Sequence, residues 1–178
     1  MAEPPAFDRT IAVCSYAAPL DQLVLSLKFG QRLAVAPALA DLLANKIKRD
    51  GASGVLIADL LLPVPLSAAR LAERGFNQSL EIARPLARSL LRPLYPRLLQ
   101  RCRDTIAQSL LPPTQRRSNL RHAFNLNPVD ADKIRGKHVG VVDDVMTTGA
   151  TLQEIAGCLI KNGARTVTNY VFARTPQR

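Results

Sequence analysis

The hydrophobic residues of this chain fall into short apolar runs separated by longer amphipathic segments. Two runs, Asp59–Val64 and Val139–Val142, are apolar enough to be strands covered on both faces. Thr10–Ala17 has the alternation of an edge strand, and Thr166–Phe172 is predicted to be a further strand. Strands that alternate with helical patterns are typical of an α/β fold with a largely parallel, twisted sheet flanked by helices.

Helical spacing of apolar residues places helices between these strands. The predicted helices are Pro19 to about Lys28, Ala38–Arg49, a segment from the capping residue Asn77 to about Leu91, and a segment from about Leu152 to Asn162-Gly163. Tyr95–Arg101 is a candidate strand, Phe124–Leu126 is ambiguous, and polar Asp104–Asn119 is predicted to be a long loop. We expect one domain over residues 1–178, in which residues 1–50 could form a small cap.

The stretch Val139–Leu152, VGVVDDVMTTGATL, carries the most specific chemistry. Carboxylates are costly to bury without partners, so Asp143 and Asp144 are expected at the end of the strand, facing a polar ligand or a cation. The residues that follow are small or hydroxylated and lead into a helix, whose first amides suit a phosphate: Thr147, Thr148, Gly149, Ala150 and Thr151. The predicted ligand is a ribose 5-phosphate. The alternative is an acidic pair that only caps the helix.

This stretch resembles the phosphoribosyl-pyrophosphate (PRPP) signature of type I phosphoribosyltransferases. The resemblance implies that Asp143 and Asp144 hold the ribose hydroxyls, directly or through Mg²⁺, and that residues 147–151 wrap the 5-phosphate. Mg²⁺ with PRPP as substrate is therefore the implied cofactor, although no residue is assigned as a direct metal ligand.

A proline-rich segment follows the predicted strand Asp59–Val64 at the place where type I phosphoribosyltransferases have their pyrophosphate loop. By that resemblance, pyrophosphate would contact the loop and two arginines of the next helix: Val64, Pro65, Leu66, Ser67, Arg70 and Arg74. The alternative is an ordinary proline turn.

Further motifs resemble the ComF family of competence-associated proteins over about residues 16–176. They are Leu27-Lys28-Phe29, Arg70-x-x-x-Arg74-Gly75-Phe76-Asn77-Gln78, Arg103-Asp104-Thr105-x-x-Gln108 and Arg116-x-x-Asn119. The third and fourth also resemble the loop that closes over PRPP in glutamine amidophosphoribosyltransferases. The resemblance gives catalytic roles to Arg103 and Arg116 beside Asp143 and Asp144. The alternative is a surface loop without catalytic contacts.

The implied activity is Mg²⁺-dependent transfer of the 5-phosphoribosyl group from PRPP to an unknown acceptor, with release of pyrophosphate. ComF membership also implies a link to DNA uptake and nucleotide salvage, with single-stranded DNA or the competence machinery as partners. A non-catalytic regulator that binds PRPP or a nucleotide stays open. ComF proteins commonly carry a four-cysteine zinc module, and the scattered Cys14, Cys102 and Cys158 do not form one, so no zinc is expected in this chain.

The charge of the chain is concentrated in its middle third. The net charge is +10, and residues 65–122 contain eleven arginines against three acidic residues. Arginine suits phosphate and nucleic acid, although solvated side chains without a ligand are the alternative. The apolar stretches are too short to insert into a membrane and no signal peptide is visible, so a cytoplasmic location is expected. Homo-oligomerisation stays open.

Overall fold

A four-stranded parallel sheet forms the centre of the molecule in the computed structural model, which describes residues 4–18, 20–29, 33–102 and 123–176. The strand order is β1 (Arg9–Ser15), β6 (Thr166–Arg174), β5 (His138–Met146) and β2 (Leu60–Pro63), and every neighbouring pair is parallel. The predicted α/β fold with a parallel sheet is therefore confirmed. All four strands end at one side, which we call the C-terminal end of the sheet.

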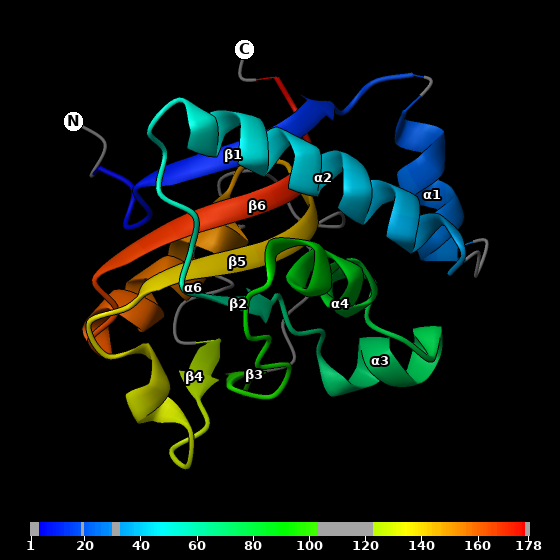
Figure 1. Ribbon diagram of the computed structural model, residues 1–178. Coiled ribbons are helices and arrows are strands. Elements are labelled where there is room, and N and C mark those ends of the chain that lie inside the picture. The colour runs from blue at the N-terminus through cyan, green and yellow to red at the C-terminus, as the bar shows by residue number, and fades with distance from the viewer. Residues whose placement is uncertain (1–3, 19, 30–32, 103–122, 177–178) are drawn as a thin grey trace.

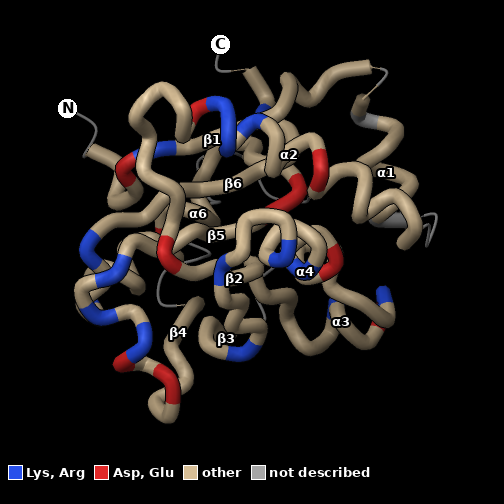
Figure 2. The backbone as a smooth tube through the Cα atoms, in the orientation of Figure 1, with Lys and Arg blue, Asp and Glu red and all other residues tan. Residues whose placement is uncertain are grey.

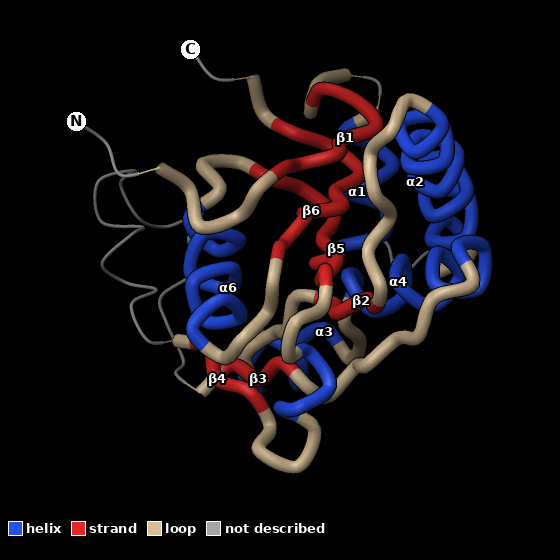
Figure 3. The backbone as a smooth tube through the Cα atoms, turned by 60° about the vertical axis from the view of Figure 1, so that its left-hand side comes forward, coloured by secondary structure: helices blue, strands red, loops and turns tan. Residues whose placement is uncertain are grey.

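Helices cover both faces of this sheet (Figures 1 and 3). α2 (Val35–Ala52) and α4 (Gln78–Leu90) lie on one face, and α6 (Ala150–Lys161) lies on the other. The shorter helices α1 (Asp21–Phe29) and α3 (Ala68–Arg74) follow β1 and β2. β3 (Leu99–Arg101) and β4 (Phe124–Leu126) form a separate antiparallel pair, and a 3-10 helix, Ala131–Ile134, precedes β5.

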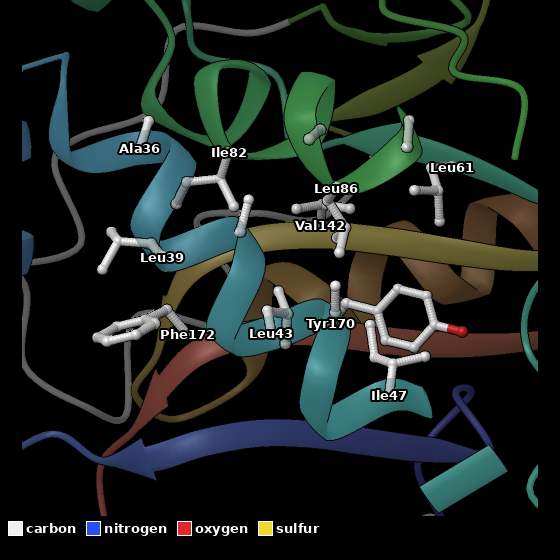
Figure 4. Close-up of a cluster of buried hydrophobic side chains, with 14 of the residues drawn as sticks. Ala36, Leu39, Leu43, Ile47, Leu61, Ile82, Leu86, Val142, Tyr170 and Phe172 are labelled. Carbon is white, nitrogen blue, oxygen red and sulfur yellow. The ribbon is translucent and has the colours of Figure 1, made fainter. Parts of the chain in front are cut away.

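The core on the α2–α4 face is built from the apolar stripes of the two helices and the inward side chains of β5 and β6 (Figure 4). Leu39, Leu43 and Ile47 of α2 are fully buried at helical spacing. Burying each such side chain contributes roughly 1.5–3 kcal/mol. Tyr170 and Phe172 of β6 are also fully buried here, and this aromatic pair fixes the distance between the sheet and α2.

The ring of Tyr170 occupies its place because β5 has a glycine, Gly140, where the ring lies. A Cβ added at Gly140 would lie 2.6 Å from Cε2 of Tyr170 and 2.6 Å from Cδ2 of Leu61. The Tyr170 hydroxyl accepts a hydrogen bond of 3.0 Å from the amide of Ala58, and burial raises the pKa of this phenol. The ring therefore packs against bare backbone while its polar end is satisfied.

Several predicted boundaries shift in the structure. β5 continues four residues past Val142, because β6 runs beside it as far as Arg174. α2 is longer than predicted at both ends, and Pro37 fits in its first turn, where an amide has no acceptor within the helix. Of the predicted strand Tyr95–Arg101, only Leu99–Arg101 belongs to β3. The ambiguous Phe124–Leu126 is its partner β4.

The first fifty residues contribute to the main layers of the fold, since β1 pairs with β6 and α2 packs beside α4. α1 lies at the C-terminal end of the sheet, beyond β1 (Figure 1). Whether this segment acts as a cap over a ligand stays a prediction. None of the described helices is long and apolar enough to span a bilayer.

A buried histidine at the start of β5 is expected to make stability depend on pH. Nε2 of His138 lies 2.9 Å from Oγ1 of Thr168, and burial lowers the pKa of the imidazole below its ordinary value of 6.5, against the opposing charges of Asp59 and Asp8. The unfolded chain therefore binds the proton more readily, and stability falls as the pH drops below 6.5. We expect the melting temperature to fall between about pH 7.5 and about pH 5.5, and to fall less in His138→Gln. Equal falls in the two proteins would contradict this.

Candidate functional site

The candidate site lies at the C-terminal end of the sheet, where β2 leaves β5. The register pairs Pro63 with Val142, and the amide of Val64 donates a 3.0 Å hydrogen bond to the carbonyl of Val142. Pro65 has no amide hydrogen and cannot continue the ladder. From Asp143 onward, no strand of the described residues therefore lies beside β5 on the β2 side.

Past the point where β2 leaves β5, the carboxylates of Asp143 and Asp144 accept hydrogen bonds from backbone amides of β5. The amide of Asp144 donates to Oδ1 of Asp143 at 2.9 Å, and the amide of Val145 donates to Oδ1 of Asp144 at 2.7 Å. We expected both acids at the end of the strand, facing a polar ligand or a cation, and the ligand itself stays a prediction. Both belong to β5, and Asp144 is only 3% exposed. Asp143, which is half-buried, is the more accessible of the two.

The start of α4 holds Asp143 and the loop after β2 together. Oγ of the buried Ser79 donates to Oδ1 of Asp143 at 2.8 Å. Asn77 caps the helix, with Oδ1 accepting from the amide of Ser79 at 3.0 Å, and its Nδ2 donates to the carbonyl of Val64 at 3.0 Å. The predicted cap at Asn77 is thus confirmed, and it also anchors the loop.

Sequence reasoning missed Ser79. A signal was present, because Ser79 shares the buried face of α4 with Ile82, Ala83 and Leu86 at helical spacing. A hydroxyl on a core-facing stripe requires a hydrogen-bond partner. The partner lies 64 residues further along the chain, so the sequence could indicate that Ser79 needs a partner but not that the partner is Asp143.

The loop after β5 is exposed at its two threonines and buried at Gly149. Thr147 and Thr148 are exposed, and Gly149 adopts a left-handed φ of 78° before the first turn of α6. A Cβ at Gly149 would lie 2.5 Å from Cε of the buried Met146, so the loop rests directly on that side chain. Oγ1 of Thr148 lies 3.4 Å from the amide of Ala150. Within the described part of the chain, no protein acceptor meets the amides of Thr148, Gly149 and Thr151.

The predicted pyrophosphate loop runs beside Asp143. Val64 and Ser67 are buried, whereas Pro65 and Leu66 are half-buried. Ser67 caps α3, with its hydroxyl 3.4 Å from the amide of Arg70. These positions join the loop to the helix that carries the two predicted arginines.

The motif after that loop forms the turn between α3 and α4. Gly75 ends α3 with a φ of 77°, which favours glycine. Nη1 of Arg74 donates to Oε1 of Gln78 at 2.9 Å, and Arg70 is half-buried on α3. The segment Arg74–Gln78 thus has a structural role that its resemblance alone did not reveal.

The predicted catalytic arginines Arg103 and Arg116 lie outside the described residues, as do Thr105 and Gln108. β3 ends at Arg101 and β4 begins at Phe124, so these residues belong to the connection between two antiparallel strands. Their roles stay predictions.

Comparison with known proteins decides the family. Residues 38–178 match the model of the phosphoribosyl transferase domain. The chain belongs to this family. The chain is 38% identical over 174 residues to the DNA utilization protein YhgH of Escherichia coli O157:H7, covering 97% of this chain and 75% of that protein. It is 32% identical to competence protein F of Haemophilus influenzae, over 96% of this chain and 74% of the relative. The predicted ComF relationship is therefore confirmed.

Solved structures with a similar fold match the chain at lower identity. The glutamine PRPP amidotransferase of B. subtilis matches with a TM-score of 0.49 and 21% identity, over 76% of this chain and 25% of that chain. A hypoxanthine phosphoribosyl transferase of Trypanosoma cruzi matches with a TM-score of 0.47 and 16% identity, over 80% of this chain and 74% of that chain.

Ser79→Ala is expected to weaken PRPP binding without unfolding the protein. The change removes the donor to Asp143, while the amide of Ser79 still bonds to Asn77. A hydrogen bond of this kind contributes about 0.5–1.5 kcal/mol, so the dissociation constant should rise roughly two- to tenfold. Isothermal titration calorimetry would measure it. Ser89→Ala, on the same helix but bonded only to exposed Lys48, is the matched control and should bind as the wild type does. Equal affinities in all three proteins would contradict the positioning role.

Proposed function

We propose that this protein binds PRPP at the C-terminal end of its sheet and transfers the 5-phosphoribosyl group to an acceptor, releasing pyrophosphate. The observation that supports the proposal best is the combination at the end of β5. An accessible carboxylate, Asp143, is followed within one short loop by amides that have no acceptor in the described part of the chain. A sugar phosphate has hydroxyls that can donate to the carboxylate and a phosphate that can accept from the amides.

Each part of the site has a role in this proposal. The loop of residues 147–151 grips the 5-phosphate through backbone amides and the hydroxyls of its threonines. Asp143 accepts the ribose hydroxyls, held in place by Ser79. Asp144, whose carboxylate is buried and bonded to the amide of Val145, keeps the strand in the geometry that presents Asp143.

Magnesium fits the donors that the site offers. Mg²⁺ prefers oxygen ligands and is usually bound by one or two carboxylates together with substrate phosphates and water. Asp143 and Asp144 are such carboxylates, and within the described residues no group of three His, Cys, Asp or Glu side chains could hold a metal by itself. Asp143 would hold the ion together with the substrate. When bound, Mg²⁺ would neutralise negative charge on the diphosphate.

The chain's own residues would carry out the transfer by positioning and by charge stabilisation. The loop Val64–Ser67 lies beside Asp143, so a diphosphate joined to the ribose would extend toward it, within reach of α3. Arg70 and Arg74 would stabilise the negative charge of the leaving pyrophosphate, and Arg103 and Arg116 would join them from the segment between β3 and β4. No covalent nucleophile is required, because the acceptor attacks C1 as the pyrophosphate leaves.

A second candidate function is the handling of single-stranded DNA. The names of the relatives, DNA utilization protein and competence protein, favour it, as does the net charge of +10. In that case, the site at the end of β5 would bind a nucleotide connected with DNA uptake in the cytoplasm. It would either act on this nucleotide as an enzyme or bind PRPP as a sensor without transferring it.

The decisive experiment separates binding from transfer. Calorimetry with PRPP, with and without Mg²⁺, should show Mg²⁺-dependent binding to the wild-type protein. A panel of nucleobases and amines should then be screened for release of pyrophosphate. Binding together with release identifies a transferase, and binding without release from any acceptor supports the regulator. No binding of PRPP under either condition would overturn the proposal.

A further inference from the structure

A groove at the far end of α4 has no part in the proposed transfer. It is a shallow hollow of about 600 Å³ lined by three arginines and three aliphatic residues: Arg84, Arg88, Arg92, Ala87, Leu91 and Leu94. Ser79 precedes Arg84, the first lining residue, by five residues and Leu91 by twelve, so the groove extends from about 7.5 Å to about 18 Å along the helix axis from the Ser79–Asp143 contact. A ligand in the groove would therefore not touch the PRPP site.

Leu91 is the residue that stability does not explain. It ends α4 in a left-handed conformation, with φ 53°, and it is the only non-glycine residue with positive φ in the described part of the chain. Its side chain is 86% exposed. A branched side chain in this conformation costs about 1 kcal/mol, and an exposed leucine contributes no burial in return. Glycine or asparagine would end the helix at lower cost.

The arginines of the groove are available to a partner. Arg88 and Arg92 are exposed, and within the residues that the structure describes neither has a carboxylate within 4.0 Å. Arg84 pairs with Glu81 at 3.1 Å, and its side chain is 57% exposed. Figure 2 shows blue segments, which mark Lys or Arg, on α4. Arg84 and Arg88 lie one helical turn apart on α4, and Arg92 follows the end of the helix, so three cations border the apolar surface.

The floor of the groove is held rigidly. The amide of Leu61 donates to the carbonyl of Pro93 at 2.9 Å, and the amide of Tyr95 donates to the carbonyl of Leu61 at 3.0 Å. These bonds fix the segment with Leu94 against β2, and the amide of Arg92 donates to the carbonyl of Ala87 at 3.0 Å. The backbone of the groove is therefore already ordered before a ligand binds. Binding then loses little conformational entropy, which favours affinity.

We infer that this groove binds an acidic, amphipathic peptide segment of a partner protein. Carboxylates of the segment would pair with Arg88 and Arg92, and an aliphatic or aromatic side chain between them would cover Leu91 and Leu94. Charge complementarity selects an acidic partner. Nucleic acid is the less favoured occupant, because single strands bind through aromatic stacking and none of the lining residues is aromatic.

Fluorescence anisotropy with a labelled peptide in which Asp-Glu pairs alternate with Leu and Phe tests the inference. The wild-type protein should bind this peptide and should not bind the same peptide with Lys in place of the acids. Arg88→Glu should weaken binding about tenfold, as expected for a lost charge pair. Leu91→Gly should weaken binding while keeping or raising the melting temperature, which a merely structural leucine would not do.

Two controls distinguish peptide binding at the groove from a general effect of net charge and from an effect on PRPP binding. Lys161→Glu makes the same charge change on α6, on the opposite face of the sheet, and should bind the peptide like the wild type. PRPP affinity should be unchanged in Arg88→Glu. The inference is overturned if Lys161→Glu weakens binding as much as Arg88→Glu does, or if labelled oligothymidylate binds the groove and the peptide does not. Sedimentation that shows a dimer lost in Leu91→Gly would instead assign the groove to a second copy of the chain.

Discussion

Asp143→Asn is expected to raise the dissociation constant for PRPP about tenfold to a hundredfold while leaving the fold intact. The amide keeps an oxygen that can accept from Ser79 and from the amide of Asp144, so the local hydrogen bonds persist. The negative charge is lost, and hydrogen bonds to charged groups contribute about 1.5–3 kcal/mol. Calorimetry in the presence of Mg²⁺ measures the change, and circular dichroism confirms that the protein is folded.

The neighbouring acid and a distant one provide the comparison for this variant. Asp144→Asn should weaken PRPP binding less, because the side chain is buried and bonded to the amide of Val145. Asp132→Asn changes a carboxylate that is 89% exposed on the 3-10 helix and should have no effect. Wild-type affinity in Asp143→Asn would remove this carboxylate from the proposed site.

Gly140→Ala is expected to be the most destabilising single-methyl change in the described core. The new Cβ would lie 2.6 Å from Leu61 and 2.6 Å from the Tyr170 ring, and 3.0 Å from Cβ of Ala58. Tyr170 cannot withdraw without breaking its hydrogen bond to Ala58. Overpacking of this kind costs about 1–3 kcal/mol, and the three contacts place Gly140 at the upper end. Urea denaturation would measure the free energy of unfolding.

A second glycine serves as the matched control. Gly157 lies inside α6, and a Cβ there meets nothing within 4 Å. Gly157→Ala should therefore stabilise the protein by about 0.5–1 kcal/mol, because alanine loses less backbone entropy in a helix. If both variants changed the stability in the same direction, the packing of Tyr170 against β5 would not be what selects glycine at position 140.

The spacing of apolar residues predicted most of the sheet and the helices around it, because a face that is buried requires apolar residues at regular positions. The stripe Leu152–Leu159 of α6 and the cap Asn77 of α4 are of this kind. The end of β5 could not be predicted in this way. Two aspartates interrupt the apolar run, and the strand continues only because β6 lies beside it.

The candidate site was predicted in part. The signature residues and the loop after β2 are local in sequence, and the structure places them at one end of the sheet. The link from Ser79 to Asp143 joins residues far apart in the chain, so no local pattern contains it. The strain at Leu91 was invisible for a different reason, since a backbone angle has no signature in composition.

The carboxylates of Asp143 and Asp144, which accept hydrogen bonds from the next amides of β5, also oppose aggregation at this end of the strand. A strand that extends past its neighbour offers free amides to any other chain, and such edges promote aggregation. Here the amides of Asp144 and Val145 are already occupied by side-chain oxygens, and pairing with another strand would bury the charge of Asp143. The end of β5 can therefore bind a small ligand without pairing with a strand of another protein.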